Sequence, residues 1–380
     1  MTTQTHTIQS VGAQGDGVAE NGVFIALTLP GETVTARGSG DRLELAEVVA
    51  PSLHRVIPPC PHFGVCGGCA LQHWAHAPYL AWKSDQVRAA LARARIETEI
   101  AVAFAASPGT RRRVALHARR VGREVHLGFK GRRSWAVEAI DVCAIADPAI
   151  VAALPILRTL AAPFLEHPKS APILHVTATR TGLDIDVTGV ERKGGGLSAD
   201  ARARAARACV GADIARVTLA GEMVYQAQAP MVALGGAIVA LPPGAFLQAV
   251  PAAEEAMASV MLEAAAGAHR IADLYCGVGT FTFRLAAVAP VLAADASAGA
   301  IAALRSAMAG APGLKAIDAQ ARDLDRRPVL AQELKKIDVV VFDPPRAGAA
   351  AQAAQLAESK SPAWLASPAT RPPSPATPAR

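Results

Sequence analysis

The C-terminal third of the sequence predicts an α/β fold built on a doubly wound parallel sheet of the Rossmann-like type. Three short apolar runs support this prediction, because each has the length of a buried strand and helical patterns separate them. The runs span residues 270–274, 291–295 and 337–342. In such sheets the ligand binds at the carboxyl ends of the strands, so the residues after each run are the candidate site residues.

The first run leads into a glycine turn at residues 275–280, and a helix-like segment follows at residues 281–288. Strand, glycine turn and helix together let the backbone approach a nucleotide-like ligand closely. Glycine is expected there because a Cβ would occupy the ligand's space. The second run ends in Asp295, at a place where an acid typically binds ribose hydroxyls, and the third leads into Asp343-Pro344-Pro345.

A further helix is predicted from Pro251 to about residue 266. Proline in the first turn and Gly267 just after the end fit the usual asymmetry of helix termini. The helix leads into the first run, so Gln248 is expected near the ligand. A lone glutamine would otherwise be assigned to a solvent-exposed loop.

At 380 residues and 51% apolar content, the chain is long enough for two or three domains with sizeable cores. No run of about 18 apolar residues appears, and residues 1–20 lack the apolar stretch of a signal peptide. We therefore expect a cytoplasmic protein without a membrane partner, and a monomer.

Positive charge is concentrated in one part of the chain. The net charge is +6, and from residue 101 to residue 137 the only acid is Glu124. A basic field of this kind suits a phosphate backbone, although a solvated strand face would also explain it. The residues expected to contact nucleic acid are Arg111, Arg112, Arg113, Arg119, Lys130 and Arg132.

Residues 1–57 predict a small β-domain, because short apolar strands flank turn signals at Asn21-Gly22 and Pro30-Gly31. This pattern is typical of a barrel of the oligonucleotide-binding kind. A structural domain without a ligand fits the pattern equally well. Helices are expected at residues 78–96 and 201–209.

Three cysteines, Cys60, Cys66 and Cys69, lie within ten residues with glycines between them. Thiols so spaced can converge on one inorganic centre, and zinc would more usually show two C-x-x-C pairs. An iron–sulfur cluster is therefore favoured over zinc, with distant Cys143 as the candidate fourth ligand. Cys209 lies in an Ala/Arg helical stretch and is expected in the core. Free thiols clustered by chance are the remaining alternative.

Taken together, these motifs are similar to those of the bacterial uracil-C5 RNA methyltransferases, especially those that act on 23S ribosomal RNA. The resemblance covers residues 8–360 and implies a class I methyltransferase domain, an N-terminal TRAM-like barrel and a central α+β RNA-binding domain. It implies a [4Fe-4S] cluster on Cys60, Cys66, Cys69 and Cys143. It implies S-adenosylmethionine bound by Gln248, Tyr275, Gly277, Gly279, Thr280, Asp295, Asp323 and Asp343.

The resemblance also divides the chain. The barrel takes residues 1–57, and the iron–sulfur loop residues 58–77. The central RNA-binding region takes residues 78–240, with its first helices expected to pack on the catalytic domain. The methyltransferase domain takes residues 241–360, and a proline-rich tail residues 361–380. The implied partner is RNA, with ribosomal RNA favoured over tRNA.

The chain departs from the family near its C-terminus. The family nucleophile is a cysteine in a Ser-Cys-Asn-Pro segment, and a glutamate acts as the base, but no cysteine follows Cys276. No catalytic residue is therefore assigned. The tail at residues 361–380 is rich in proline, which lacks a ladder donor, so it is not expected to supply a central strand.

One synonymous coding of residues 363–379, read from the third base of each codon, gives Val-Val-Gly-Val-Ser-Cys-Asn-Pro. We infer a frameshift near Lys360 and expect the chain as written to be inactive. Two other functions remain open. One is a non-catalytic iron–sulfur RNA-binding protein. The other is an amino-group methyltransferase using Asp343-Pro344-Pro345, although such enzymes normally carry an aromatic residue where Arg346 stands.

Overall fold

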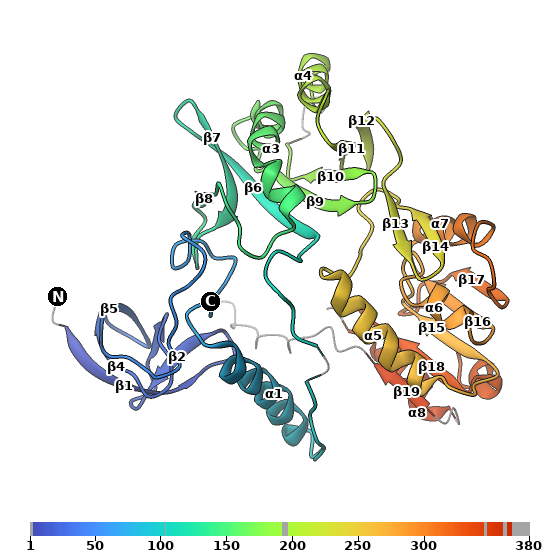
Figure 1. The fold of residues 1–380 in the computed structure, drawn as a ribbon, viewed down its shortest axis with the longest axis horizontal. Coiled ribbons are helices and arrows are strands. Elements are labelled where there is room, and N and C mark those ends of the chain that lie inside the picture. Colours follow the sequence, from blue (N-terminus) through green and yellow to red (C-terminus); the bar gives the residue numbers. More distant parts are fainter. Residues whose placement is uncertain (1–2, 103, 192–196, 346–347, 360–362, 367–380) are drawn as a thin grey trace. The chain divides into compact units, whose positions relative to one another are not determined.

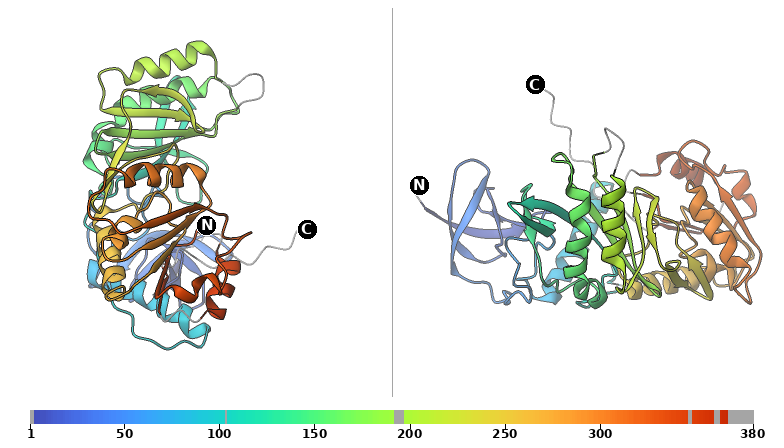
Figure 2. Two further views of the ribbon diagram at one scale, coloured as in Figure 1. Left: turned by 90° about the vertical axis from the view of Figure 1, so that its right-hand side faces the viewer. Right: turned by 90° about the horizontal axis from the view of Figure 1, so that it is seen from above.

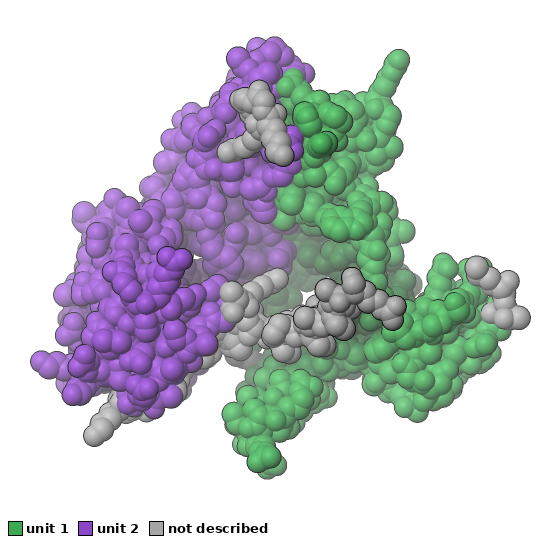
Figure 3. All heavy atoms as spheres, turned by 180° about the vertical axis from the view of Figure 1, so that it is seen from behind, with its two compact units in different colours: residues 1–109, 115–173 green, residues 110–114, 174–380 purple. Residues whose placement is uncertain are grey.

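The structure is a computed structural model that describes residues 3–102, 104–191, 197–345, 348–359 and 363–366. Figure 1 shows the helices and strands, and Figure 3 colours the two compact units into which the chain divides. Unit 1 comprises residues 1–109 and 115–173, and unit 2 comprises residues 110–114 and 174–380. Within the described ranges, no helix is both long enough and apolar enough to cross a membrane.

Unit 1 begins with a closed five-stranded barrel, as the sequence predicts. Its strands follow the order β1-β2-β3-β5-β4 around the barrel. Alternation along the strands turns apolar side chains inward, and Ile8, Ile25 and Val34 are fully buried in the core. The strands are β1 (Gln4–Val11), β2 (Asp16–Ala19), β3 (Phe24–Ala26), β4 (Thr33–Arg37) and β5 (Arg42–Ala50).

The remainder of unit 1 holds the cysteine loop, helix α1 (His76–Arg93) and a group of antiparallel strands. Helix α1 ends where Arg95 adopts a positive φ of 60°, and the Ile96 N–H closes the last turn on the Leu91 carbonyl. Strand β7 pairs with β6 on one side and with β8 on the other. These elements are β6 (Arg113–Val121), β7 (Glu124–Lys130), β8 (Val137–Ala139), α2 (Pro148–Ala152), α3 (Leu154–Ala161) and η1 (Ala162–Leu165).

Unit 2 begins with a small mixed sheet, in which β10 and β11 are parallel and β11 and β12 antiparallel. Ser198 caps helix α4 by accepting the Ala201 N–H at 3.1 Å, and Cys209 at its end is fully buried, which confirms the expected core cysteine. The elements are β9 (Ile173–Thr179), β10 (Gly182–Thr188), α4 (Ala199–Cys209), β11 (Ile214–Leu219), β12 (Glu222–Gln226), β13 (Met231–Leu234) and β14 (Ala237–Ala240).

The C-terminal part of unit 2 is a five-stranded parallel sheet in the order β17-β16-β15-β18-β19, which confirms the predicted Rossmann-like fold. Helices lie on both faces of the sheet (Figure 2), and an apolar cluster forms on each face. One joins the sheet to α5, α6 and α7, and the other joins it to η2 and α8. The elements are α5 (Pro251–Ala264), β15 (Ile271–Leu274), α6 (Thr282–Ala286), β16 (Val291–Asp295), α7 (Ala298–Met308), β17 (Ile317–Ala321), η2 (Glu333–Lys336), β18 (Val339–Phe342), α8 (Ala350–Glu358) and β19 (Ala363–Ala366).

Strand β19 lies beyond residue 360, in the segment that the sequence analysis called a proline-rich tail and did not expect to supply a central strand. Ala363–Ala366 pairs in parallel with β18, so the sheet extends past the expected boundary at residue 360. The physical reason is local, because these four residues contain no proline and can supply every ladder donor. The strand lies at an edge of the sheet. Residues 367–380 and Arg346 lie outside the described residues.

Candidate functional site

The glycine turn begins directly after β15, and its backbone explains its composition. Tyr275, Gly277 and Gly279 all have positive φ, at 62°, 55° and 95°. A Cβ on Gly279 would lie 2.6 Å from the Phe283 ring, so packing alone requires glycine there. A Cβ on Gly277 would meet no atom within 4 Å, so this glycine leaves open space at the strand end.

Asp295 lies at the end of β16, as the sequence predicts, and its carboxylate contacts the glycine turn. Its Oδ2 accepts the Gly277 N–H at 2.9 Å, and its Oδ1 accepts the Ser297 N–H at 2.8 Å. Ser297 in turn caps helix α7. The carboxylate is therefore held by two backbone donors in a fixed position beside the turn, with lone pairs left for a ligand hydroxyl.

Gln248 and Asp343 are 95 residues apart in the chain, and the structure brings their side chains together. The Gln248 Nε2 donates to Asp343 Oδ2 at 2.7 Å. Asp343 follows β18, and its N–H donates to the Leu274 carbonyl at the end of β15 at 3.3 Å. The expectation that Gln248 lies near the strand ends is therefore supported by its contact with Asp343.

Sequence reasoning missed Asp325, which contacts Tyr275. The Tyr275 hydroxyl donates to Asp325 Oδ1 at 3.3 Å. Burial and the nearby carboxylates of Asp325, Asp323 and Asp295 raise the pKa of Tyr275 above its usual value. Asp323 itself accepts the Asp325 and Arg326 N–H groups and shapes the loop after β17. The Asp-Leu-Asp spacing was the available signal, because it places a second acid beside the predicted one.

Asp273 on β15 is fully buried and accepts a 2.6 Å hydrogen bond from Thr282 Oγ1. Burial, together with the neighbouring Asp343 and Asp295 carboxylates, raises its pKa to about 7. Three carboxyl groups thus lie near one another at the strand ends, and Gly277 leaves open space beside them. Such a site favours a ligand with hydroxyl groups and positive charge.

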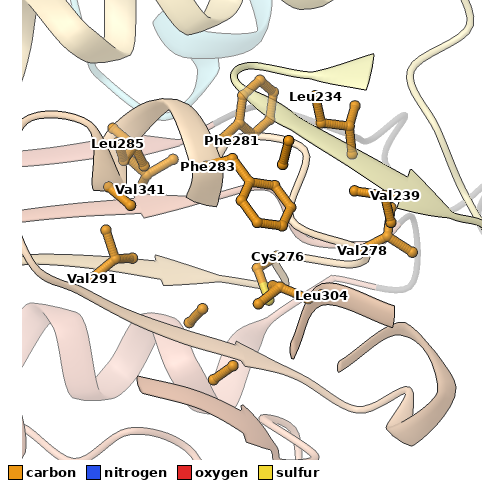
Figure 4. Close-up of a cluster of buried hydrophobic side chains, with 14 of the residues drawn as sticks. Leu234, Val239, Cys276, Val278, Phe281, Phe283, Leu285, Val291, Leu304 and Val341 are labelled. Carbon is orange, nitrogen blue, oxygen red and sulfur yellow. The ribbon is translucent and has the colours of Figure 1, made fainter. Parts of the chain in front are cut away.

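Cys276 is no nucleophile in this setting. It lies in an apolar cluster with Val278 and Leu304 (Figure 4) and is 4% exposed. Burial raises the pKa of its thiol well above the usual value, and Asp273 and Asp295 raise it further. A thiol rather than a thiolate is therefore present near neutral pH, and only the thiolate is strongly nucleophilic.

The predicted basic residues occupy different environments, and Arg112 requires a correction. Its side chain is 8% exposed and forms an ion pair with buried Glu254, so its position is that of a structural residue rather than an RNA contact. Arg113 is partly buried, and burial together with the adjacent arginines lowers its pKa. Arg119 donates to the Ser170 carbonyl at 3.3 Å, whereas Arg111 is exposed.

Arg132 likewise has a protein partner. Asp16, at the start of β2, is 1% exposed and forms ion pairs with Arg42, Arg132 and Arg133. These contacts tie the turn between β7 and β8 to the barrel within unit 1. Lys130, at the end of β7, instead places its ammonium 4.0 Å from the ring centre of Trp135, which is 79% exposed.

The cysteine loop is fixed to the end of β7. The Gly67 N–H donates to the Lys130 carbonyl at 2.9 Å, and a Cβ on Gly67 would approach that oxygen to 2.5 Å. The Gly68 N–H donates to Cys66 Sγ at 3.4 Å. This donor and the close backbone contact explain the two glycines, which leave room for the loop to fold over β7.

The four thiols of Cys60, Cys66, Cys69 and Cys143 are half-buried and free of disulfides. Burial raises the pKa of Cys66, and the thiols of Cys69, Cys60 and Cys143 raise it further, so each of these three lies within electrostatic range of Cys66. Across the described ranges, however, no three His, Cys, Asp or Glu side chains are arranged to hold a metal ion. The described arrangement of these cysteines is therefore not that of a closed metal site.

Comparisons with known proteins agree with this architecture. No protein-family model matches the chain. An uncharacterized RNA methyltransferase of Caulobacter vibrioides is 63% identical over 363 residues, covering 94% of this chain and 88% of that protein. The 23S rRNA (uracil(1939)-C(5))-methyltransferase RlmD of Halomonas elongata is 33% identical over 389 residues, covering 94% and 79%.

A similar fold is also found among solved structures. The crystal structure of Pyrococcus abyssi tRNA (uracil-54, C5)-methyltransferase in complex with S-adenosyl-L-homocysteine has a TM-score of 0.68 and 20% identity. It covers 95% of this chain and 89% of that one, which supports the class I methyltransferase fold and the N-terminal barrel. On the identities and coverages of its sequence relatives, the chain belongs to the uracil-C5 RNA methyltransferase family.

Proposed function

We propose that the carboxyl ends of β15, β16 and β18 bind S-adenosylmethionine, and that the family reaction is methyl transfer to C5 of uracil in RNA. The observation that carries the proposal is the convergence of two contacts at the strand ends. Asp295 accepts from Gly277, and Gln248 donates to Asp343. The solved Pyrococcus abyssi relative is a complex with S-adenosyl-L-homocysteine, the product of such a donor.

The donor supplies a methyl group on a positively charged sulfonium, and each site residue has a role suited to it. Asp295 accepts hydrogen bonds from ribose hydroxyls, and the glycine turn admits the donor close to the backbone. The carboxylate of Asp343, oriented by Gln248, favours the positive charge of the donor. Tyr275, Thr280, Gly279 and Asp323 shape the same turn and the loop beside it.

The chemistry of uracil explains what else the reaction needs. Carbon 5 is a weak nucleophile until a thiolate adds to carbon 6. After methyl transfer, a base removes the C5 proton and the thiolate is expelled. No cysteine follows Cys276 in these 380 residues, and Cys276 is buried with a raised pKa. We infer that this polypeptide binds donor and RNA without transferring the methyl group.

As candidate RNA contacts we retain Arg111 in unit 2 and, separately, Arg119 and Lys130 in unit 1. In unit 1 we add Trp135, an exposed aromatic residue that the sequence analysis did not single out. An aromatic face beside a cation suits stacking on an unpaired base next to a phosphate. Ribosomal RNA is the proposed substrate class. Its support is the 33% identity to a 23S rRNA enzyme over 94% of the chain.

We also propose a [4Fe-4S] cluster on Cys60, Cys66, Cys69 and Cys143, with a structural or RNA-positioning role. Its support is the Gly68 N–H directed at Cys66 Sγ, together with the effect of the Cys60, Cys69 and Cys143 thiols on Cys66. Anaerobic reconstitution with iron and sulfide should give about four irons per chain and broad visible absorption. A Cys69→Ser variant should bind fewer irons per chain. Equal, low iron in both proteins would reject the cluster.

The central test uses two polypeptides, the chain as written and a chain in which the shifted frame restores Ser-Cys-Asn-Pro. Both should bind S-adenosyl-L-homocysteine in calorimetry. Only the restored chain should convert uridine to 5-methyluridine in a 23S rRNA transcript, measured by nucleoside mass spectrometry, with a tRNA transcript for comparison. Formation of 5-methyluridine by the chain as written would refute the inferred inactivity, and an N-methylated base would favour the amino-group alternative.

A further inference from the structure

A buried chain of ion pairs contacts two segments of the candidate donor site, and the proposed function does not account for it. Glu254 in the first turn of α5 is 2% exposed and accepts from two arginines. Its Oε2 accepts from Arg112, and its Oε1 accepts from Arg284 at 3.0 Å. Both arginines are buried as well, and Arg284 forms a second ion pair with Glu255, so the two buried positive charges have two carboxylate partners.

Arg112 also fixes the backbone that carries Gln248. Its N–H donates to the Ala249 carbonyl at 2.8 Å, and its Nε donates to the Gln248 carbonyl at 2.9 Å. The neighbouring Arg113 donates to the Leu247 carbonyl at 2.6 Å. Two consecutive residues therefore hold three consecutive carbonyls, 247 to 249, just before helix α5.

Arg284, the other partner of Glu254, also holds a backbone carbonyl of the candidate site. It belongs to α6, and its NH1 donates to the carbonyl of Thr280 in the glycine turn. A single carboxylate, that of Glu254, thus connects an arginine that holds the Gln248 segment to an arginine that holds the glycine turn. Both segments belong to the candidate donor site.

Arginine suits this position for a geometric reason. A planar guanidinium presents several donors in a fixed fork, so Arg112 can bind a carboxylate and a carbonyl at the same time. A lysine ammonium could keep the ion pair with Glu254, but its compact head would not also reach the Gln248 carbonyl in the same geometry. The two functions of Arg112 can therefore be separated by one substitution.

We propose that Arg112 is a positioning residue for methyl-donor binding, acting through the Gln248 carbonyl and anchored by Glu254. By fixing the backbone of Gln248, it presents the Gln248 amide to Asp343 and to the donor. The proposal rests on the proposed function, since it assumes that this site binds the donor. The new element is that a buried arginine, which does not itself contact the donor, contributes to donor affinity.

The test is a double-mutant cycle on the full chain, with the Kd of S-adenosyl-L-homocysteine measured by calorimetry and the unfolding temperature measured in parallel. The variants are Arg112→Lys, Gln248→Ala and their combination. Arg216→Lys is the matched control, because Arg216 is also buried and also binds a carboxylate, Asp184, and a carbonyl, that of Leu241.

Arg112→Lys should weaken binding about tenfold in the native background and less than about twofold once Gln248 is alanine. Arg216→Lys should leave the Kd unchanged. The proposal would be overturned if Arg112→Lys raised the Kd by the same factor with and without Gln248→Ala. It would also be overturned if Arg112→Lys alone left the Kd unchanged. If Arg112→Lys does not fold, the same cycle with Arg113→Met tests the hold on the segment through Leu247. A native chain that binds no ligand would instead refute the donor site itself.

Discussion

At the scale of single residues, Asp273 makes stability depend on pH. Burial raises its pKa in the folded protein to about 7, from an ordinary 3.8. Between these values the folded protein holds a proton that the unfolded chain releases. Stability therefore falls as pH rises through this window, and the loss is complete above the folded pKa.

Replacing Asp273 with asparagine should remove this dependence, because an amide has no proton to lose and can still accept from Thr282. The unfolding temperature of the native chain should fall more between about pH 5 and about pH 8 than that of Asp273→Asn. Asp318→Asn, an exposed carboxylate on β17, is the control and should follow the native profile. If the unfolding temperatures of Asp273→Asn and the native chain changed equally with pH, the raised pKa of Asp273 would not be the cause of the pH dependence.

Gly277 and Gly279 should respond differently to alanine. At Gly279 the new Cβ would lie 2.6 Å from the Phe283 ring, so Gly279→Ala should lower the free energy of unfolding by about 2 kcal/mol or more. At Gly277 the Cβ meets open space, and only the positive φ costs about 1 kcal/mol. Urea unfolding measures both effects.

The open space at Gly277 should also matter for ligand affinity. Gly277→Ala should fold yet bind S-adenosyl-L-homocysteine more weakly, because its Cβ enters the space left beside Asp295. Native affinity in folded Gly277→Ala would show that the donor does not approach this part of the turn.

At the scale of elements, the turn between β7 and β8 presents Trp135 to solvent with the Lys130 ammonium over its ring. Trp135→Ala should weaken binding to a single-stranded RNA by about 1 kcal/mol, roughly fivefold in Kd, because a stacking surface is lost. Trp135→Phe should retain most of the affinity. Filter binding at fixed salt measures the three proteins, and equal Kd values for Trp135→Ala and the native chain would exclude Trp135 from the RNA surface.

The same turn is anchored by Asp16, whose pKa reflects opposing effects. Burial alone would raise it, but Arg133, Arg132 and Arg42 outweigh burial and hold the pKa below the ordinary 3.8. The stabilisation is therefore present above about pH 4 and is lost as pH falls through the folded pKa.

Asp16→Asn should consequently destabilise the chain at pH 7 by about 2 kcal/mol, a figure that allows for the partial exposure of the three arginines. The difference in the free energy of unfolding between Asp16→Asn and the native chain should become smaller below about pH 4. Asp85→Asn breaks an exposed ion pair with Arg88 and should change stability little. If the difference in the free energy of unfolding between Asp16→Asn and the native chain stayed constant with pH, the charge of Asp16 would not be the cause of the destabilisation.

At the scale of the whole molecule, β19 is the edge strand of the parallel sheet in the part of the chain that the structure describes. An unpaired edge exposes ladder donors and acceptors and promotes association between chains. The resemblance implies further strands of this sheet in the restored frame, and these would cover the edge. The chain with the restored frame should therefore unfold at higher temperature and elute as a monomer more completely in size-exclusion chromatography. If the chain as written is equally stable and monomeric, the frame change does not disturb the sheet.

The elements that the sequence predicted well are those with a local physical cause. Short apolar runs of strand length became β15, β16 and β18, and Pro251 and Gly267 bracket helix α5. The predicted acids lie at the strand ends, because the carboxyl ends of parallel strands share one edge. Strand β19 was missed because the proline content of the whole tail concealed four residues without proline.

The arrangement of the basic residues could not be predicted in this way, because burial and pairing depend on residues far apart in the chain. Arg112 pairs with Glu254 across 142 residues, and Arg132 pairs with Asp16 across 116. A run of arginines reads as one charged surface in sequence, yet only the tertiary structure separates buried ion pairs from exposed cations.

The sequence by itself therefore determined the family, the parallel sheet, the barrel and the residues at the strand ends, since each follows from a short motif or a local period. Tertiary structure alone decided which arginines face solvent, and it placed Asp325 beside Tyr275 and buried Glu254 between two arginines. The physical reason is that the cost of burying a charge depends on its partner, and folding brings these partners together from distant parts of the chain.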